Sequence, residues 1–170
     1  MLIDELNKLE KIVNSELTSK IISSKIENEE LKIEVEFDEL NNVIKFLKSD
    51  DRCKFRQLID IAGVDKPSEV KRFSLIYLLL SHEFNFRVKI LINFETEKKI
   101  SSITKIFPSA NWMEREVFDM YGIKFNDHPD LRRILTDYGF SGHPLRKDFP
   151  ITGHSEVRYS EEKKKVIYEP

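Results

Sequence analysis

The order of hydrophobic and polar residues follows two different periods along this chain. Apolar residues three or four positions apart predict amphipathic helices, and alternating apolar and polar residues predict strands with one wet face. Helical spacing is found at residues 2–16, 40–49 and 96–107. We expect Asp38 to cap the second of these helices and Pro108 to end the third.

Alternating positions predict the strands of a sheet. They are found at residues 20–27, 31–37, 55–61, 72–81 and 86–94. The first two segments predict a hairpin with one polar face, the third is expected to end at Gly63, and the last two form the clearest hairpin. The strand 72–81 is apolar on both faces, which is typical of a central strand. The fold class is therefore α+β, a mixed or antiparallel sheet flanked by helices.

The last part of the chain has a different composition. From Gly139 onward glycine, proline and charged residues are frequent, and the apolar residues are too dispersed to form a second core. Short extended pieces are expected at 156–159 and 166–170. We divide the chain into a globular domain, residues 1–138, and an extended tail, residues 139–170. Alone, the tail should be loose and should become ordered on a partner.

Charged, aromatic and turn-forming residues are densest in residues 112–150, where a helix is predicted first. Ser109 or Asn111 can begin this helix, and Gly122 suits the left-handed residue that ends one. Its apolar stripe contains Met113, Val117, Met120 and Tyr121. The opposite side collects Arg115, Glu116 and Asp119 around Trp112. A solvated face with an Arg115–Asp119 pair is the ordinary interpretation, but the aromatic residue among the charges favours a contact surface.

The residues after this helix strengthen that interpretation. Asp130 can begin a short helix over 131–135, whose two arginines, Arg132 and Arg133, point to different sides. Beyond it, residues 136–150 combine glycine, proline, aromatic and charged residues. Arginine and aromatic anchors on a path fixed by glycine and proline are typical of a buried contact surface.

These motifs resemble the 30 kDa subunit family of respiratory complex I, the proton-pumping NADH:quinone oxidoreductase; the mitochondrial member is NADH dehydrogenase subunit 9. The motifs that carry the resemblance are Trp112 with ERE at 114–116, DMYG at 119–122, HPDLRRIL at 128–135 and GHPLRKDFP at 142–150. A weaker match at 55–65 and 71–81 extends the resemblance over about the last two thirds of the chain. Members of the family usually continue beyond the Glu169-Pro170 pair with a segment rich in aromatic residues and arginine.

The resemblance implies a structural and assembly role in the peripheral arm of that enzyme. The chain would have no catalytic centre, cofactor or metal, although it belongs to an enzyme complex; FMN, iron–sulfur clusters, NADH and quinone would be carried by partner subunits. It would dock on the large quinone-site subunit and on neighbouring iron–sulfur subunits. The residues expected at the interface are Trp112, Glu114, Arg115, Glu116, Asp119, His128, Asp130, Arg132, Arg133, His143, Arg146, Lys147, Asp148 and Phe149.

Composition and charge fit this role and weaken others. The net charge of −2 and the pI near 6.1 give no overall field for nucleic acid. The single cysteine, Cys53, excludes an internal disulfide and a cysteine-ligated cluster or zinc site, and indicates a reducing compartment. No signal peptide and no apolar stretch of membrane-spanning length is found. We expect attachment through partners, on the matrix side of the mitochondrial inner membrane or the cytoplasmic side of a bacterial one.

Other kinds of chemistry have weak support. His128, Asp130, His143, Asp148 and His154 include metal-ligating residue types, but their spacing matches no known ligand pattern. Glu114 and Glu116 face apart on the predicted helix, and Arg115 is expected to keep both ionised in an ion-pair network. Glycine-rich phosphate-binding motifs and a nucleophile elbow are absent from the sequence.

Three alternatives stay open. The first is the equivalent subunit of a membrane-bound hydrogenase, and the second is a stand-alone metal-dependent enzyme. The third is an RNA-binding stripe of Arg132, Arg133, Arg146 and Lys147 with Phe140 and Phe149. Acidic residues next to this stripe weaken the RNA-binding interpretation.

Overall fold

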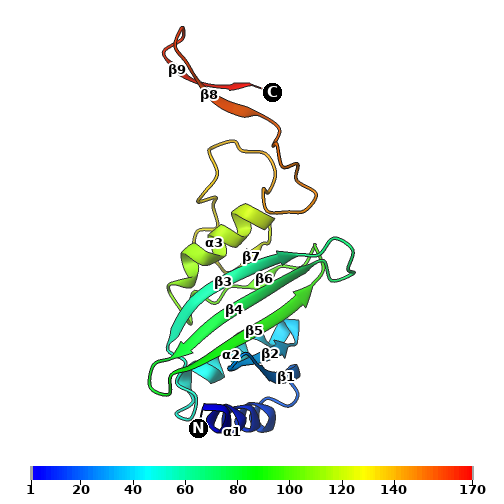
Figure 1. The fold of residues 1–170 in the computed structure, drawn as a ribbon, viewed down its shortest axis with the longest axis vertical. Coiled ribbons are helices and arrows are strands. Elements are labelled where there is room, and N and C mark those ends of the chain that lie inside the picture. The colour runs from blue at the N-terminus through cyan, green and yellow to red at the C-terminus, as the bar shows by residue number, and fades with distance from the viewer. Residues whose placement is uncertain (1, 170) are drawn as a thin grey trace.

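A five-stranded mixed sheet is the centre of the computed structural model, which describes residues 2–169. The order of the strands is β1-β2-β5-β4-β3 (Figure 1). Their bounds are β1 Ile21–Glu27, β2 Glu30–Val35, β3 Gln57–Asp65, β4 Phe73–Ser81 and β5 Phe86–Phe94. β4 has a neighbour on each side, as the two apolar faces of 72–81 predict. The mixed sheet and its helices confirm the α+β fold class.

Both predicted hairpins form. β1 pairs with β2 and β4 pairs with β5 in antiparallel fashion, while β2 and β5 are parallel. The registers place Ile33 and Tyr77 on either side of Ile90, and all three side chains are buried. Since alternate residues of a strand point to the same face, these three residues mark the face of the sheet that lies on the core.

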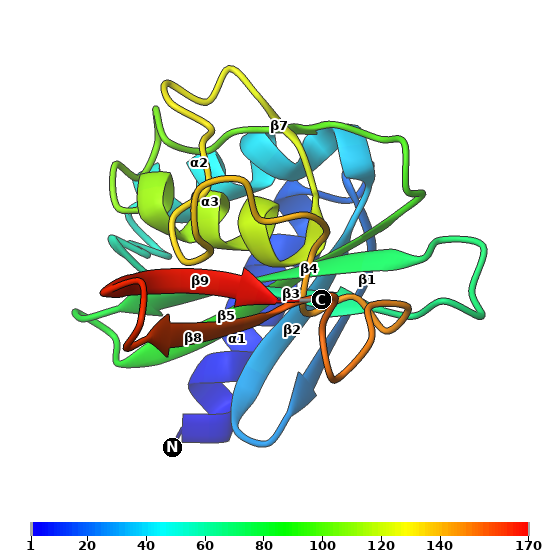
Figure 2. The same ribbon diagram turned by 90° about the horizontal axis from the view of Figure 1, so that it is seen from above.

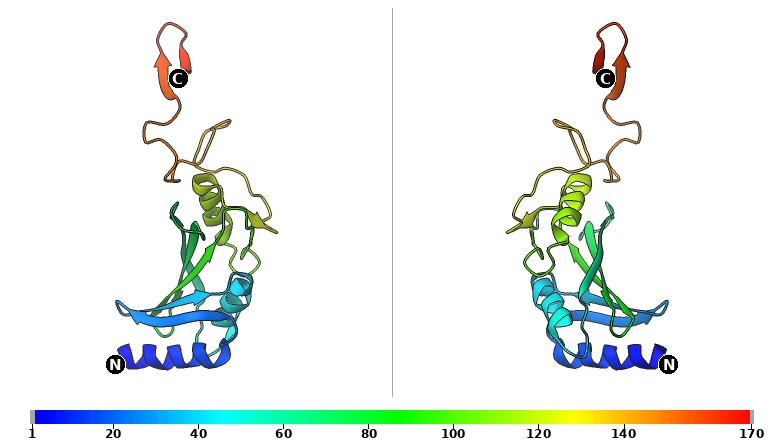
Figure 3. Two further views of the ribbon diagram at one scale, coloured as in Figure 1. Left: turned by 90° about the vertical axis from the view of Figure 1, so that its right-hand side faces the viewer. Right: turned by 90° about the vertical axis from the view of Figure 1, so that its left-hand side faces the viewer.

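Three α-helices complete the core. They are α1 Leu2–Glu16, α2 Leu40–Ser49 and α3 Ala110–Tyr121. α2 and α3 lie on the same side of strands β3, β4 and β5 (Figure 2), and α1 contacts β1 and β2 (Figure 3). Their buried residues, among them Leu9, Ile44 and Val117, join one hydrophobic cluster with the strands. None of the helices among residues 2–169 is long and apolar enough to cross a membrane.

Two short sheets lie outside the main one. β6 (Ile100–Ser101) pairs with β7 (Phe125–Asn126) in parallel, next to α3. β8 (Glu156–Ser160) and β9 (Lys165–Glu169) form an antiparallel hairpin that stands away from the five-stranded sheet (Figures 1 and 3). The extended pieces predicted for the tail are the two strands of this hairpin.

The helix predicted at residues 96–107 is wrong. The segment contains β6 and turns, and the amides of Ile100 and Ser102 donate to the carbonyls of Lys124 and Asn126. The apolar residues Ile100, Ile103 and Phe107 are all buried, so the pattern predicted burial correctly. Their spacing suits a short strand followed by a turn as well as a helix, and the pairing partner lies too far along the chain to be read locally.

Two further local predictions are wrong. Gly63 does not end a strand, because β3 continues through it to Asp65. A Cβ atom at Gly63 would lie 2.7 Å from the ring of Tyr121, so the glycine admits this ring against the strand. Asp38 does not cap α2: a 3-10 helix, Phe37–Glu39, precedes α2, and no side chain caps either helix.

Candidate partner interface

Helix α3 organises the site through its two ends and its two faces. Ser109 is its N-cap residue, without a side-chain cap, and Gly122 ends it with a φ of 73°. This left-handed conformation is easiest for glycine, as the sequence predicted. Val117 and Met120 are buried as expected, and the side chain of Trp112 is exposed. Two charged residues of the helix, Glu114 and Asp119, are wholly buried.

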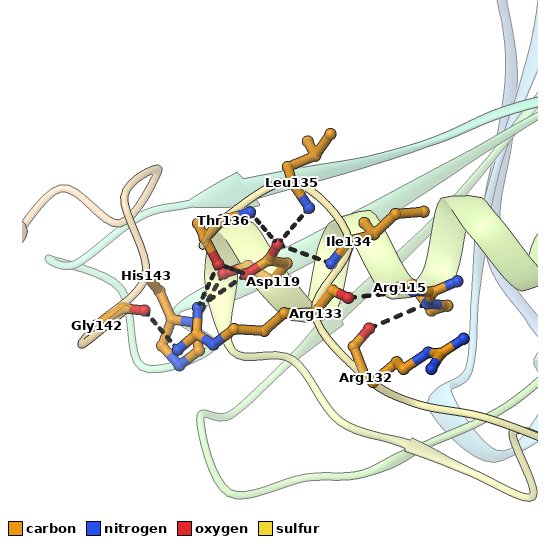
Figure 4. Close-up of polar contacts among 9 residues, drawn as sticks. All are labelled: Arg115, Asp119, Arg132, Arg133, Ile134, Leu135, Thr136, Gly142 and His143. Carbon is orange, nitrogen blue, oxygen red and sulfur yellow. Dashed lines mark hydrogen bonds and ion pairs between the residues drawn. The ribbon is translucent and has the colours of Figure 1, made fainter. Parts of the chain in front are cut away.

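The carboxylate of Asp119 is the centre of a clamp that holds residues 133–136. One oxygen, Oδ2, accepts hydrogen bonds from the backbone amides of Ile134, Leu135 and Thr136 at 3.0, 2.7 and 2.9 Å (Figure 4). The other, Oδ1, accepts from the Thr136 hydroxyl at 2.6 Å and from Nη1 of Arg133 at 2.8 Å. Consecutive amides that converge on one anion form a concave binding site for it. The clamp therefore fixes this loop on the end of α3.

The clamp also sets the charge state of Asp119. Burial alone would raise the pKa of this carboxyl, but the hydrogen bonds from Thr136, Leu135 and Ile134 hold it well below its usual range. Asp119 is therefore ionised at neutral pH. The short helix predicted at 131–135 does not form, because the amides of Ile134 and Leu135 donate to Asp119 and not to backbone carbonyls one turn earlier.

Two arginines fix this loop: Arg133, which is part of it, and Arg115, which reaches it from α3. Arg133 bonds Asp119 through Nη1, donates through Nη2 to the carbonyl of Gly142 at 2.9 Å, and lies over the Phe140 ring. Arg115 donates to the carbonyls of Arg132 and Arg133 at 3.0 and 3.1 Å (Figure 4). The Arg115–Asp119 pair expected from their spacing does not form, because Arg115 bonds the carbonyls of residues 132 and 133 and Asp119 bonds residues 133–136.

Residues 143–146 cap the C-terminal end of α3. The last four carbonyls of an α-helix lack partners within it. Here the carbonyl of Phe118 accepts from the amide of Gly122, and the next three accept from Nδ1 of His143, the amide of Leu145 and Nε of Arg146. A Cβ atom at Gly122 would lie 2.5 Å from Nε2 of His143. The glycine thus permits both the helix end and the approach of this segment.

A second buried carboxylate holds residues 147 and 148. Asp65, at the end of β3, is bonded twice by Arg72, at 2.6 and 2.8 Å, and accepts from the amide of Lys147 at 2.8 Å. The bonds from Arg72, aided by Lys147, lower the pKa of Asp65. Arg72 also pairs with Asp148 at 2.8 Å. The segment 142–148 is consequently attached to the sheet and to the end of α3.

Glu114 is the other buried acid of α3. Its carboxyl accepts hydrogen bonds from the Ser102 hydroxyl at 2.7 Å and from the amide of Ile103 at 2.8 Å. Burial raises its pKa to about 7, and these two bonds oppose the rise. The expectation that Arg115 keeps Glu114 ionised is therefore wrong: Arg115 points to the loop, and Glu114 points into the core toward the segment before α3.

His128 lies next to Glu114. Its Nδ1 accepts a hydrogen bond from the amide of Asp130 at 3.1 Å, so Nε2 carries the proton and donates to the carbonyl of Asn111 at 3.0 Å. The side chain is wholly buried. His128 thus joins the start of α3 to the loop after β7, and Pro129 follows it in an exposed turn.

The structure divides the predicted interface residues into three sets. Two of them, Glu114 and Asp119, are buried inside the chain, and we remove both from the interface. Side chains engaged within the chain and partly or fully covered are those of Arg115, His128, Arg133, His143, Arg146 and Phe149. Those that are exposed are Trp112, Glu116, Asp130, Arg132, Lys147 and Asp148. The internal set positions the segments that carry the exposed set.

Several residues of the site were not predicted from the sequence. They are the buried acid Asp65 and three residues that bond buried carboxylates, Arg72 to Asp65, Ser102 to Glu114 and Thr136 to Asp119. Thr136 follows the HPDLRRIL motif, and Asp65 and Arg72 lie in the weaker match at 55–65 and 71–81, but nothing local in the sequence indicated these bonds. Exposed apolar side chains beside the interface set are those of Leu135 and Tyr138, and farther along the chain Val157, Tyr159, Val166 and Tyr168.

The alternative chemistries find little support in this arrangement. Among residues 2–169, no three histidine, cysteine or acidic side chains are close enough together to hold a metal ion. Of the four cations of the RNA stripe, Arg133 and Arg146 are bonded to the chain itself, and Arg132 pairs with Asp130 at 3.0 Å. In the described part of the chain Arg146 and Lys147 have no side-chain ion pair, and only Lys147 has no side-chain hydrogen bond to the chain either.

Comparison with known proteins identifies the family. Residues 33–155 match the family described as the 30 Kd subunit of respiratory-chain NADH dehydrogenase. The chain is 57% identical over 124 residues to the C subunit of the NADH-quinone oxidoreductase of Paramagnetospirillum magneticum, and 56% identical over 124 residues to that of Mesorhizobium japonicum. Each match covers 73% of this chain and 62% of the relative, so the matched region spans less than two thirds of these relatives.

A solved structure has the same fold. It is described as the membrane-bound sulfane sulfur reductase, an archaeal respiratory membrane complex, and one of its chains matches with a TM-score of 0.71 and 25% identity. The match covers 94% of this chain and 99% of that one. The family match includes α3, the Asp119 clamp and the segment that caps the helix. This chain therefore belongs to the family of the 30 kDa subunit of respiratory-chain NADH dehydrogenase.

Proposed function

We propose that the chain is a non-catalytic assembly subunit of the peripheral arm of NADH:quinone oxidoreductase. The observation that carries this proposal is the identity of 54–57% over 124 residues to the C subunits of this enzyme from several bacteria. In this proposal the chain supports electron transfer from NADH to quinone by docking on the large quinone-site subunit. FMN, iron–sulfur clusters, NADH and quinone are bound by other subunits, and the chain is held at the membrane by its partners.

The exposed surface around α3 supports a role in docking. Trp112 is 70% exposed and Leu135 is 62% exposed. Arg132 is exposed in the loop that the Asp119 clamp holds on the domain. Tryptophan and arginine are enriched among the residues that dominate binding energy at interfaces. Because the clamp holds the loop in place before binding, little ordering entropy is lost when a partner covers it.

The β8–β9 hairpin supports a second contact. Its register places Val157 opposite Tyr168 and Tyr159 opposite Val166, so these four side chains share one face. All four are more than half exposed. A two-stranded hairpin is at best marginally stable alone in water, and a partner that covers this face would stabilise it. The partner-binding part of the tail is then the hairpin and the residues from Pro150 that lead to it.

The proposal is tested by purifying the chain from membranes of cells that express it with an affinity tag. The large quinone-site subunit and the iron–sulfur subunits should be recovered with it. A double variant, Trp112→Ala with Arg132→Glu, should lower their recovery about tenfold or more, because it removes an anchor and reverses a charge. Ile22→Ala, which alters an exposed apolar residue on β1, serves as the control. Recovery of the wild-type chain without any of these subunits would refute the proposal.

A second candidate is the equivalent subunit of another membrane-bound respiratory complex. The likeness to a chain of the archaeal sulfane sulfur reductase favours it. The identity of 25% to that chain, against 57% to a C subunit of NADH-quinone oxidoreductase, makes it the weaker candidate. The same purification decides between them, because the co-purifying subunits would belong to a different enzyme.

A further inference from the structure

A basic depression lies between the C-terminal half of α2 and the segment before α3. It has a volume of about 550 Å³ and is lined by Lys45, Lys48, Ser49, Arg56, Lys105 and Ile106. Four of these six residues carry a positive charge and none is acidic. The whole chain has a net charge of −2, so this surface departs from the rest of the molecule.

One of the four cations has a role within the chain. Nζ of Lys48 donates to the carbonyl of Ile106 and lies 4.6 Å from the centre of the Phe107 ring. It therefore joins α2 to the segment before α3 and forms part of the floor of the depression. Its contacts explain Lys48 without a partner protein.

The other three cations have no such explanation. Lys45, Arg56 and Lys105 are exposed, and none has a carboxylate within 4.0 Å in the described part of the chain. Other cations with acidic neighbours are paired, such as Lys54 with Glu83 at 2.7 Å. Three like charges around one hollow repel each other, so the cluster does not stabilise the isolated domain.

We propose that this depression receives an acidic segment of a neighbouring protein in the complex. The inference rests on the proposed function, since it needs a complex, but it assigns a surface separate from the exposed surface around α3, with Trp112, Arg132 and Leu135, and from the β8–β9 hairpin. Carboxylates that enter the hollow would pair with Lys45, Arg56 and Lys105, and aliphatic side chains would contact Ile106. Charge complementarity of this kind speeds association and fixes the register of the partner.

The shape of the site favours a peptide segment over a membrane or a nucleic acid. Basic patches that bind anionic bilayers gather four to eight cations on a surface that the headgroups reach. Here only three free cations surround the depression, fewer than such patches gather. Single-stranded nucleic acid needs exposed aromatic platforms, and the aromatic residue nearest the floor, Phe107, is buried.

The first experiment uses the assembled complex and a carbodiimide, which joins a lysine amine to a carboxylate without a spacer. We expect cross-links from Lys45 and Lys105 to aspartate or glutamate residues of another protein of the complex. The triple variant Lys45→Glu, Arg56→Glu, Lys105→Glu should fold with an unchanged melting temperature and lower recovery of the complex about tenfold or more. The control reverses Lys11, Lys99 and Lys124, exposed lysines outside the depression, and should assemble normally.

The second experiment separates this inference from the proposed function. The isolated full chain is titrated with a short synthetic peptide rich in glutamate, while backbone amide signals are followed by NMR. Signals of residues 45–49, 56 and 105–106 should shift, less at higher salt, and the triple variant should show no shift.

If the wild-type complex assembles but gives no cross-link between subunits and the triple variant assembles fully, the inference is wrong. Binding of the chain to phosphatidylserine vesicles that only the triple variant loses would also overturn it, in favour of a lipid site.

Discussion

Nε2 of His128 lies 3.9 Å from a carboxylate oxygen of Glu114, and both side chains are wholly buried. Both ring nitrogens of His128 are engaged elsewhere, Nδ1 by the amide of Asp130 and Nε2 by the carbonyl of Asn111, so neither forms a hydrogen bond to Glu114. Burial, and to a lesser degree the charge of Glu114, raise the pKa of Tyr77, whose hydroxyl has no hydrogen-bond partner among the described residues. An ionised Glu114 is therefore stabilised by only two hydrogen bonds, from Ser102 and Ile103.

Stability should consequently depend on pH through Glu114. Its pKa is about 7 in the folded protein against an ordinary value of 4.5, so the folded state binds this proton more tightly. Protonated Glu114 therefore adds to the free energy of unfolding. This stabilising contribution is fully present below pH 4.5 and is lost as the pH rises through about 7. It amounts to about 3 kcal/mol at most.

Glu114→Gln removes the titrating group and keeps an acceptor for the amide of Ile103. Urea unfolding at pH 5 and pH 8.5 should show a smaller loss of stability in this variant than in the wild type. Glu116→Gln, on the exposed side of the same helix, is the control and should behave as the wild type. Equal pH dependence in all three proteins would contradict a raised pKa of Glu114.

Asp119→Asn should destabilise the isolated chain by about 3 to 5 kcal/mol, because it leaves Arg133 and several amides without their anion. Asp130→Asn, which alters an exposed acid beside exposed Arg132, should cost less than about 0.5 kcal/mol. Chemical denaturation measures both. Hydrogen exchange adds a local readout: the amides of residues 134–136 should lose protection in the first variant only.

The role of Gly122 can be separated into two parts. Alanine at this position would have a positive φ and would place a Cβ 2.5 Å from His143 and 2.6 Å from Arg146. Alanine at Gly139, where φ is 80°, would meet nothing within 4 Å. Gly139→Ala therefore measures the backbone cost, about 1 kcal/mol. Gly122→Ala should cost clearly more, and thermal unfolding that found equal losses would argue against the contact with residues 143–146.

Arg146→Glu should lower the melting temperature of the chain alone. The guanidinium of Arg146 donates to the carbonyl of Tyr121 at 2.5 Å and lies over the Phe73 ring. A hydrogen bond from a charged group contributes about 1.5 to 3 kcal/mol. Arg132→Glu changes an exposed arginine and should leave the melting temperature nearly unchanged. If Arg146→Glu melts like the wild type, the arginine belongs to the partner surface after all.

Hydrogen exchange should find two regions in the tail. The amides of Leu145 and Lys147 are bonded to Met120 and Asp65, the amide of Arg146 is bonded to His143 in the same attached segment, and all three should exchange slowly in the isolated chain. Residues 151–169 form the exposed hairpin and its linker, are joined to earlier residues by a few contacts such as that of the Tyr168 hydroxyl with Asp137, and should exchange fast until a partner covers them. This differs from the expectation that the whole tail from Gly142 is loose. Uniformly fast exchange from 142 to 169 would contradict the contacts at Asp65 and at the end of α3.

The sequence predicts well those strands and helix ends that depend on residues close together in the chain. Alternation along β1, β2, β4 and β5 and the glycine after α3 identify their elements because the relevant period or turn lies within a few residues. Glu114 and Asp119 could not be assigned in this way. On a helical wheel they resemble Glu116, and only partners 11 to 17 residues away along the chain place them inside. Gly63 was wrongly predicted to end a strand for a related reason. The glycine is there because the ring of Tyr121, far along the chain, packs against it.

The contact between Asp65 and the amide of Lys147 joins residues 82 positions apart, and Arg72 reaches Asp148 across 76. Closing so long a loop has an entropic cost that the local hairpins do not have. On the ribosome, β3 and α3 emerge well before residues 143–148, so the end of α3 stays uncapped while the sheet is already present. We expect the attachment of this segment to be the last step in folding of the domain. A nascent chain arrested before Leu145 should hence be cut by protease at α3.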